Sequence, residues 1–528
     1  MSRLVRRAAF ASGALLVACG PLLGLDDLRP RTGTTDAGDG GDAGDAPSCT
    51  SNAQCFDLAQ ESIGLCVDRR CVKVDRELCE TNVFPSRETL TRDDLLLVAA
   101  FVPRQQGLAA PVPLAYKMAV SEISKAGPVG SNPTRTLAMI FCDSDPANVA
   151  ASVKHVMQDL HVPAVIANFE GGDLKSAVEV AKQTGTFILN PSTVPTKYGN
   201  SDELLWNLLG TAEDVALAYP PLVRRLEAMN GAIKVALVSS DGALEQAMAD
   251  VVDQGPLKPP GSDRDPGQGL LLGDAAVRDS SNAARYLKVP LRRIPGSTDF
   301  DVASAVDALA TFRPDVVLLL TSDEHDEAAR LVAGYENDGG GPKPIWLLGP
   351  RNAETLVPYV QTDAGLEKRF AGIQYAGPSD PAQQTLWRER IRASELASHY
   401  EELKSLENQY DAVYWITYGM VAAGPGKATT GASLAAGVRR MIKEGKPPVS
   451  PGGIDVIDNA YRQLGVGEAR FVGALGPPDI EEAFGTWRSV GAQYCYRRNQ
   501  NLVTLDYDVF RYGPDAATEA TPCNIGGL

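Results

Sequence analysis

The feature that most constrains this chain is a regular alternation of short apolar runs with amphipathic stretches, from residue 93 to residue 348. The run Leu95–Val102 is almost entirely apolar, as expected for a strand that is buried on both faces of a sheet. The stretch after it carries Ala115, Met118 and Ile123 at helical spacing. Repetition of this β-α-β order predicts a parallel, doubly wound sheet, because parallel neighbours are joined by crossover helices.

The alternation then starts a second time. Strands are expected at 137–141, 162–166 and 187–189 in the first set, and at 233–238, 286–291, 316–320 and 345–348 in the second. A chain of 528 residues is too long for one small core. Two successive sets therefore predict an α/β protein of two similar lobes rather than one very wide sheet.

The N-terminus is typical of a secretory signal peptide. Arginines precede an apolar run at 8–18, which is too short to span a bilayer as a stable helix. The run ends in Leu-Val-Ala-Cys19, which resembles a bacterial lipobox, where the cysteine is diacylated and becomes the new N-terminus. We expect a lipoprotein signal peptide at 1–18 and lipidation of Cys19. The alternative is an ordinary signal peptide that happens to contain a cysteine.

This N-terminus predicts a protein outside the cytoplasm, anchored in the cell envelope by its lipid and facing the periplasm or the exterior. Gly20 stands where the best-known envelopes use an aspartate to retain lipoproteins at the inner membrane, so the outer membrane is favoured. No later apolar run reaches the ~18 to 20 residues that a spanning helix needs. The formal net charge of −16 argues against nucleic acid as a partner, because phosphates require stripes of Lys and Arg.

The segment 19–48 is predicted to be a flexible linker. Its part at 32–47 is rich in glycine and aspartate and nearly devoid of large apolar side chains, so burial cannot offset the entropy of ordering. The aspartates there are potential calcium ligands, but the fixed glycines and terminal ligand of EF-hand and nonapeptide loops are absent. A solvated tether is therefore favoured over a calcium site.

Of the nine cysteines, five crowd the segment 49–80, which predicts a small disulfide-rich segment in an oxidising compartment. A zinc site is the less favoured alternative, because paired C-x2-C ligands and histidines are absent there. Five is odd, so one member pairs outside the segment or stays free. Cys495 with Cys523 is one candidate pair, which leaves Cys79 and Cys142 as candidates for each other, but the sequence does not fix the connectivity. The disulfide candidates are Cys49, Cys55, Cys66, Cys71, Cys79, Cys142, Cys495 and Cys523.

Several sequence blocks, taken in their order and spacing, resemble those of a known family. The blocks are 107–127, 143–146 (Asp-Ser-Asp-Pro), 162–166, 187–195, 346–350 and 410–414. Over about 93–512 the chain resembles the bacterial type I periplasmic binding proteins, in particular the leucine/isoleucine/valine-binding branch of ABC-transporter substrate-binding lipoproteins. This resemblance implies two doubly wound parallel-sheet lobes, joined by a three-strand hinge, that close on a small polar solute. Lobe 1 is expected at 93–212 plus 378–455, and lobe 2 at 213–377 plus 456–528.

The resemblance also implies ligand contacts at the carboxyl ends of strands in both lobes, where helix N-termini and short hydroxyl side chains can hold a polar ligand. In lobe 1, the first candidates are Phe169, Glu170 and Gly171. Phe169 and Glu170 replace the family's Ser-rich run, and a carboxylate there would repel an anionic group. Ser192 and Thr193 match the family's second ligand-contacting loop. For each of these residues the alternative is an ordinary helix cap or turn.

In lobe 2, four candidates follow strands of the second set, namely Ser240, Asp241, Ser322 and Asp323. A fifth, Arg351, stands where the family's amino-acid binders carry a glutamate that pairs with the ligand ammonium. A guanidinium prefers carboxylate or phosphate partners, so a simple zwitterionic amino acid is not the expected ligand. An alignment shift of a few residues would bring Glu354 to this place instead.

No catalytic residue, metal or cofactor is expected, and the chain is not predicted to be an enzyme. A Gly-x-Ser-x-Gly elbow, a Gly-Lys-Thr phosphate loop and a metal-binding helix are absent from the sequence. The segment 139–145 is superficially similar to the first motif of haloacid-dehalogenase-like phosphatases, but the later acidic pair for magnesium is missing.

Two functions remain. The first is a lipid-anchored extracytoplasmic solute-binding protein that serves an ABC permease or acts as a sensor. The second is an envelope lipoprotein that uses the same fold as a protein–protein module without transport, similar to outer-membrane activators of peptidoglycan synthases. The long tether and the cysteine-rich segment are unusual for a simple importer subunit and count in support of the second, but the first remains the favoured function.

Overall fold

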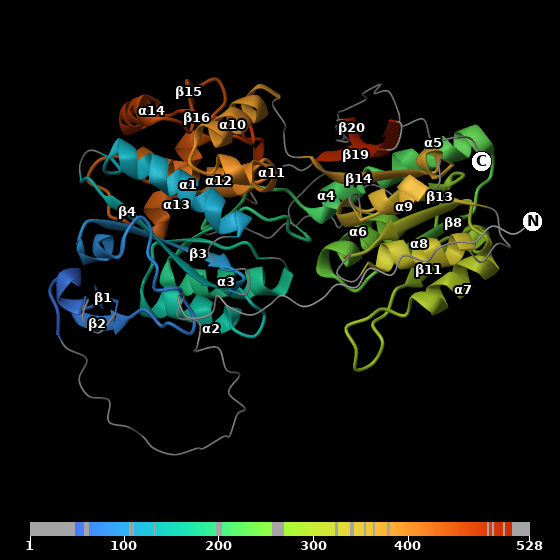
Figure 1. Ribbon diagram of the computed structural model, residues 1–528, viewed down its shortest axis with the longest axis horizontal. Coiled ribbons are helices and arrows are strands. Elements are labelled where there is room, and N and C mark those ends of the chain that lie inside the picture. The colour runs from blue at the N-terminus through green and yellow to red at the C-terminus, as the bar shows by residue number, and fades with distance from the viewer. Residues whose placement is uncertain are drawn as a thin grey trace, which may run out of the picture. The chain divides into compact units, whose positions relative to one another are not determined.

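Two seven-stranded sheets, each covered by helices, form the folded part of the chain (Figure 1). We call the halves of the chain built on them lobe 1 and lobe 2. The predicted α/β class with two doubly wound lobes is confirmed. The computed structural model describes residues 48–56, 63–104, 107, 110–130, 133–169, 171–196, 203–255, 269–322, 326–337, 343–352, 355–362, 365–376, 381–482, 485–487, 490–499 and 502–508.

Sheet 1 has the strand order β17-β18-β7-β6-β5-β3-β4, in which all neighbours from β18 to β4 are parallel and β17 is antiparallel to β18. Successive residues of β3 point to opposite faces, so Leu96 and Val98 enter one core while Leu97 and Ala99 enter the other. The strands are β3 (Leu95–Val102), β4 (Thr136–Asp143), β5 (Ala164–Ile166), β6 (Phe187–Asn190), β7 (Leu205–Asn207), β17 (Ile480–Glu481) and β18 (Thr486–Trp487).

Helices cover both faces of sheet 1. The core on one face is built with α1, α12, α13 and α14, and the core on the other face with α2, α3 and the cysteine-rich segment. Every residue of α12 after Glu407 is buried, as expected for a helix enclosed on all sides. The elements are α1 (Pro111–Ala126), α2 (Val149–Lys154), α3 (Gly171–Thr184), α10 (Pro381–Ala393), α11 (Tyr400–Leu403), α12 (Glu407–Ala422), α13 (Gly431–Met441), α14 (Ile454–Val466), β15 (Pro448–Val449) and β16 (Arg470–Phe471).

Sheet 2 has the order β11-β8-β12-β13-β14-β19-β20; its strands are parallel from β11 to β14, and β19 and β20 are added antiparallel. Helices α4, α5 and α6 contribute to the core on one face, and α7, α8 and α9 to the core on the other. The strands are β8 (Val235–Ser239), β11 (Tyr286–Pro290), β12 (Val316–Leu320), β13 (Ile345–Leu348), β14 (Phe370–Ala376), β19 (Val490–Asn499) and β20 (Leu502–Asp508). A separate two-stranded sheet pairs β9 (Leu271–Leu272) with β10 (Ala275–Ala276). The helices are α4 (Ala212–Ala216), α5 (Tyr219–Asn230), α6 (Ala243–Gln254), α7 (Val302–Phe312), α8 (Glu327–Asn337) and α9 (Val357–Thr362).

The chain passes between the two sheets three times, after β7, after β14 and after β18. These three crossings agree with the hinge that the resemblance implies. Among the described residues, no helix has both the length and the apolar character that crossing a membrane requires.

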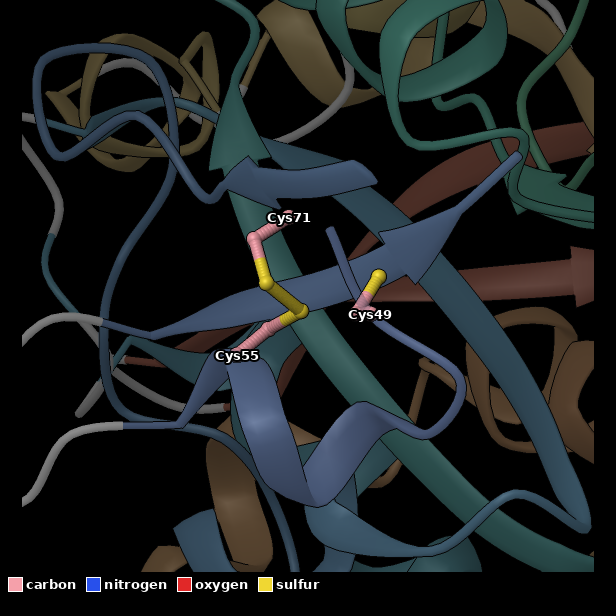
Figure 2. A group of neighbouring side chains, drawn as sticks. All are labelled: Cys49, Cys55 and Cys71. Carbon is pink, nitrogen blue, oxygen red and sulfur yellow. A yellow bond between two sulfur atoms is a disulfide. The ribbon is translucent and has the colours of Figure 1, made fainter. Parts of the chain in front are cut away.

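The cysteine-rich segment is closed by two local disulfides. Its hairpin of β1 (Gly64–Val67) and β2 (Arg70–Lys73) is antiparallel. The bridges are Cys49–Cys66 and Cys55–Cys71. The sulfur atoms of Cys49, Cys55 and Cys71 lie within 4.8 Å of one another, but each belongs to a disulfide, which supports the disulfide interpretation over the zinc site (Figure 2).

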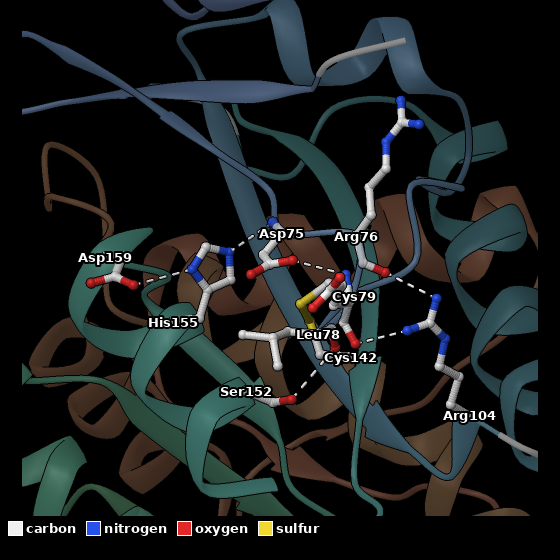
Figure 3. Close-up of a disulfide and its surroundings, with 10 residues drawn as sticks. Asp75, Arg76, Leu78, Cys79, Arg104, Cys142, Ser152, His155 and Asp159 are labelled. Atoms are coloured by element: carbon white, nitrogen blue, oxygen red, sulfur yellow. Dashed lines mark hydrogen bonds and ion pairs between the residues drawn. A yellow bond between two sulfur atoms is a disulfide. The ribbon is translucent and has the colours of Figure 1, made fainter. Parts of the chain in front are cut away.

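A third bridge joins Cys79 to Cys142 and thus connects the segment to β4 of lobe 1 (Figure 3). This candidate pair is therefore confirmed. The predicted pair Cys495–Cys523 stays a prediction, because Cys523 lies outside the described residues; Cys495 is buried in β19. Cys19 also lies outside them.

Two expected domain boundaries differ from the structure. The segment 49–80 does not form its own core, because Ile63, Leu65 and Val74 are buried in the same cluster as β3 and β4. The segment 456–528 does not belong to lobe 2 as a whole. The apolar stripe of α14 packs into the core of lobe 1, and β17 and β18 join sheet 1, so only β19 and β20 extend sheet 2.

Candidate functional site

In lobe 1, the chain turns sharply after β5. Asn168 has a positive φ of 49°, and its side-chain amide donates to the carbonyl of Phe101 at 3.0 Å and to the hydroxyl of Tyr116 at 2.6 Å. The next residue, Phe169, is 3% exposed, and its ring centroid lies 4.8 Å from that of Phe101. The Phe169 ring therefore packs in the core of lobe 1, and α3 begins two residues later at Gly171.

A row of buried amides fixes the strand ends beside this turn. Asn190 at the end of β6 accepts a hydrogen bond from the Phe169 N–H at 3.1 Å and donates to the Phe169 carbonyl at 3.2 Å. The same amide donates to Asn207 on β7, and Asn207 donates to the hydroxyl of Thr486 on β18. Sequence analysis did not identify this row, although Asn190 and Asn207 are polar residues that each end an apolar strand.

The loop after β6 carries the two hydroxyl candidates of lobe 1. Thr193 is 6% exposed and Ser192 is partly buried. Within the described part of the chain, no protein group forms a hydrogen bond with either hydroxyl. The loop itself is held in place, because Asn408 on α12 donates to the carbonyl of Pro191 at 2.5 Å. The hydroxyls of Ser192 and Thr193 thus sit on a fixed loop at a strand end and form no hydrogen bond with the residues that the structure describes.

In lobe 2, the hydroxyl candidates are engaged within the protein. The Ser240 hydroxyl accepts the Ser322 N–H at 3.0 Å, and the Ser322 hydroxyl donates to Glu327 at 2.9 Å. Ser240 and Glu327 are fully buried, and Ser322 is nearly so. These contacts link the ends of β8 and β12 to the first turn of α8.

The charged candidates of lobe 2 also have partners. The Asp241 carboxylate lies 3.3 Å from the guanidinium of Arg293, which stacks on the ring of Phe300. The Nε of Arg351 lies 3.7 Å from the Glu245 carboxylate in the first turn of α6. The charge of Arg351 is therefore balanced by a buried acid.

Two helix N-termini at this edge of sheet 2 carry buried carboxylates. Glu245 lies in the first turn of α6, and Glu327 is the first residue of α8. Carboxylates at these places are stabilised by the helix dipole and occupy positions that an anionic ligand would otherwise take. The strand ends of lobe 2 are therefore suited to a neutral or cationic group rather than to an anion.

Tyrosine hydroxyls and one amide hold the end of β13 in place. Tyr219 donates to the Leu348 carbonyl at 2.9 Å, and Tyr494 donates to the Gly349 carbonyl at 3.1 Å. Asn352, which is fully buried, donates to the Thr321 hydroxyl at 2.8 Å. Sequence analysis missed these positioning contacts, since Tyr219 and Tyr494 lie far from Leu348 along the chain. The candidates Glu170 and Asp323, and the alternative Glu354, lie outside the described residues.

Helix α12 also carries a fully buried carboxylate, Asp411, one turn after Asn408. Both carboxylate oxygens of Asp411 accept backbone N–H groups, from Ala474 at 2.8 Å and from Leu475 at 2.9 Å. A Cβ at Gly473 would lie 2.1 Å from this carboxylate, so only glycine allows the approach. Complete burial raises the pKa of Asp411 to about 7, although the two N–H groups act against the rise.

Comparison with known proteins agrees with this architecture. No protein-family model and no curated protein sequence matches the chain. Among solved structures, a type 1 periplasmic binding protein from Bordetella pertussis Tohama I is 11% identical, with 79% of this chain and 100% of that chain covered and a TM-score of 0.53. The branched-chain amino acid transporter substrate-binding protein LivJ from Streptococcus pneumoniae, solved with isoleucine, is 16% identical, covering 78% and 98%, with a TM-score of 0.48. A leucine-binding protein LivK from Thermotoga maritima is 12% identical, covering 78% and 97%, also at 0.48.

The Bordetella structure shows that this chain has the type I periplasmic binding protein fold. The fold that the sequence blocks led us to expect is therefore confirmed.

Proposed function

We propose that this protein is a lipid-anchored extracytoplasmic solute-binding protein that holds a small polar molecule at the strand ends of its lobes. The observation that carries the proposal is the pair of hydroxyls of Ser192 and Thr193. They stand on a fixed loop at the carboxyl end of β6, where ligands bind in open α/β sheets, and among the described residues neither has a hydrogen-bond partner. Acylation at Cys19 would anchor the protein in the envelope, with the outer membrane favoured, for ABC-type import or for sensing.

The charge pattern of lobe 2 narrows the chemistry of the ligand. Glu245 balances Arg351, and Glu327 accepts from Ser322, so no uncompensated cation is left among the described candidates of this lobe. A ligand carboxylate or phosphate would meet two buried acids there, at a cost in electrostatic free energy. The proposed ligand is therefore a small molecule that turns a neutral or cationic polar group toward lobe 2.

The experiment that tests the proposal is a thermal-shift panel on the full chain. The panel contains neutral amides and polyols, amines, amino acids, and organic acids and phosphates. A compound that binds only the native state raises the melting temperature by mass action, and at one hundred times its Kd the gain is ~2.7 kcal/mol. We expect shifts from neutral or cationic compounds and none from the acids and phosphates. A panel without any shift would contradict the proposal.

One observation favours the second function, an envelope interaction module. Ser240, Asp241, Ser322 and Arg351 are all engaged inside lobe 2, as they would be in a fold that has lost its ligand. For this function we expect the panel to be silent and the purified chain to co-elute with another envelope protein after crosslinking in intact cells.

A further inference from the structure

The loop after β6 is paired with the first crossing between the two sheets. We call residues 190–195 the β6 loop; the first crossing is the connection of residues 208–211 between β7 and α4. At one end of the pairing, the Leu208 N–H donates to the carbonyl of Asn190 at 2.9 Å. Further along, Val194 forms a parallel β-bridge with the crossing. The β6 loop is therefore held by the first crossing at both of its ends.

The last hydrogen bond of this pairing reaches into lobe 2. The carbonyl of Val194 accepts the N–H of Ala212, the first residue of α4, at 2.8 Å. Ala212 is fully buried in a core of lobe 2, and α4 packs against α6, β14 and β19. Thr193, whose hydroxyl is a candidate ligand contact, directly precedes Val194. A candidate ligand residue of lobe 1 is thus the neighbour of a residue that is hydrogen-bonded to the core of lobe 2.

A buried amide joins the strand of the third crossing to the same loop. Asn207, the last residue of β7, is fully buried, and its backbone N–H donates to the carbonyl of Gly485 at 2.8 Å. Its side-chain amide donates to the hydroxyl of Thr486 on β18 at 3.1 Å, and its side-chain oxygen accepts from Asn190 at 3.2 Å. Asn190 also donates to the carbonyl of Ser192 at 3.3 Å. Asn207 therefore connects β18, from which the third crossing leaves lobe 1, to the β6 loop.

The β6 loop, residues 207–212 and Thr486 thus form one hydrogen-bonded unit, which we call the clamp. Each lobe has its own sheet and its own cores, and for lobes of this kind relative motion is the default expectation. Such a motion turns the backbone of the crossings, because the crossings are the covalent connections between the lobes. The hydrogen bond between Val194 and Ala212 passes that motion to the β6 loop.

We propose that Asn207 is a positioning residue that couples the β6 loop to the first and third crossings. The orientation of the lobes and the position of the Ser192 and Thr193 hydroxyls then change together. This rests on the proposed function, because it takes the β6 loop as the ligand-binding loop. Coupling between two sites is reciprocal in free energy, so a perturbation at the crossings that reaches the loop also measures what a ligand on the loop does to the crossings.

The variant that tests the coupling is Thr486→Val. It removes the hydroxyl that accepts from Asn207 but keeps the branched shape of the side chain. The buried amide of Asn207 then lacks this partner, and water can replace it only when the clamp opens locally. We expect the opening equilibrium of the clamp to rise about 2- to 13-fold, the equivalent of one hydrogen bond.

Hydrogen–deuterium exchange of the full chain without ligand, followed by mass spectrometry, measures this opening. The peptides to follow span 188–195 and 208–216, which contain the N–H groups of Val194 and Ala212. We expect both peptides to exchange about 2- to 13-fold faster in Thr486→Val than in the wild type. Peptides from β12 are expected to keep the wild-type rate, because the effect is local.

Two further variants separate positioning from a general structural role. Thr486→Ser keeps the hydroxyl and is expected to keep the wild-type exchange of the clamp. Thr417→Val is the matched control, because Thr417 is fully buried in α12 and its hydroxyl donates to the carbonyl of Val413 in the same helix. It should leave the exchange of the clamp unchanged. If Thr486→Val does not fold, Asn207→Ser, which removes both side-chain contacts of Asn207, is expected to act in the same direction.

The proposal is overturned if the clamp peptides of the folded variant exchange at the wild-type rate. It is also overturned if Thr417→Val accelerates them equally, or if β12 accelerates as much as the clamp, because the hydroxyl would then support overall stability alone. The experiment needs no ligand. A thermal-shift panel without any shift would contradict the proposed function and leave the exchange result standing, whereas unchanged exchange overturns the coupling even when a compound binds.

Discussion

A chain in which serine replaces Cys79 and Cys142 is expected to lose about 4 kcal/mol of its free energy of unfolding. The bridge spans a sequence separation of 63, and the chain-entropy model assigns a loop of that length about this value. Both residues are almost fully buried where residues 78–84 pair with β4, so the variant also places two hydroxyls in an apolar site. Urea unfolding followed by far-ultraviolet circular dichroism measures the change.

The matched control is Cys55→Ser/Cys71→Ser, whose bridge spans a separation of only 16. The same model gives about 3 kcal/mol for that loop, so its removal is expected to cost less. An equal or larger loss in the control would show that loop length is not what makes the Cys79–Cys142 bridge important.

The second large effect is an unusual dependence of stability on pH. The pKa of Asp411 is raised by burial to about 7, compared with about 3.8 in the unfolded chain, so the folded state binds the proton more tightly. Its contribution to stability is therefore fully present below pH 3.8 and is lost as the pH rises through 7. Between pH 5 and pH 8 the loss from this one group is about 2 to 3 kcal/mol. The pKa of the neighbouring Glu407 is also raised to about 7 by burial and acts in the same direction.

The measurement is the difference between two pH profiles of the unfolding free energy. Asp411→Asn is expected to lower stability at pH 5, because its NH2 group meets a backbone N–H, but to flatten the decline from pH 5 to pH 8. Asp458→Asn, at an acid on α14 with an exposed side chain, is the matched control and should keep the wild-type slope. If the unfolding free energy of Asp411→Asn fell as steeply from pH 5 to pH 8 as that of the wild type, the result would contradict a raised pKa at Asp411.

Eight strands of the two sheets were predictable because each is a short apolar run between turns, namely β3, β4, β5, β6, β8, β11, β12 and β13. The strands β7, β14 and β17 to β20 were not predicted. The runs at 316–320 and 345–348 coincide with β12 and β13. The assignment of 456–528 to lobe 2 failed because α14 follows β14 of lobe 2 in sequence order, while its apolar stripe packs on helices of lobe 1. Periodicity reveals that a face is apolar, but not which of two cores receives it.

For the candidate site, the sequence located the strand ends but not the contacts among them. Arg351 was a candidate ligand contact whose guanidinium prefers an anionic partner, and in the structure its Nε lies 3.7 Å from the Glu245 carboxylate. Glu245 stands more than one hundred residues earlier in the chain, so only the parallel pairing of β8 with β12 and of β12 with β13 brings the two together. Contacts of this kind depend on tertiary structure and leave no local signal.

The most direct test of the proposed function is the affinity of the best compound from the thermal-shift panel for Thr193→Ala, measured by isothermal titration calorimetry. One hydrogen bond contributes about 0.5 to 1.5 kcal/mol, so we expect Kd to rise roughly 2- to 13-fold. Thr311→Ala, which removes an exposed hydroxyl on α7, is the matched control and should leave Kd unchanged. An unchanged Kd for Thr193→Ala, with the same enthalpy of binding as wild type, would contradict a ligand site on the β6 loop.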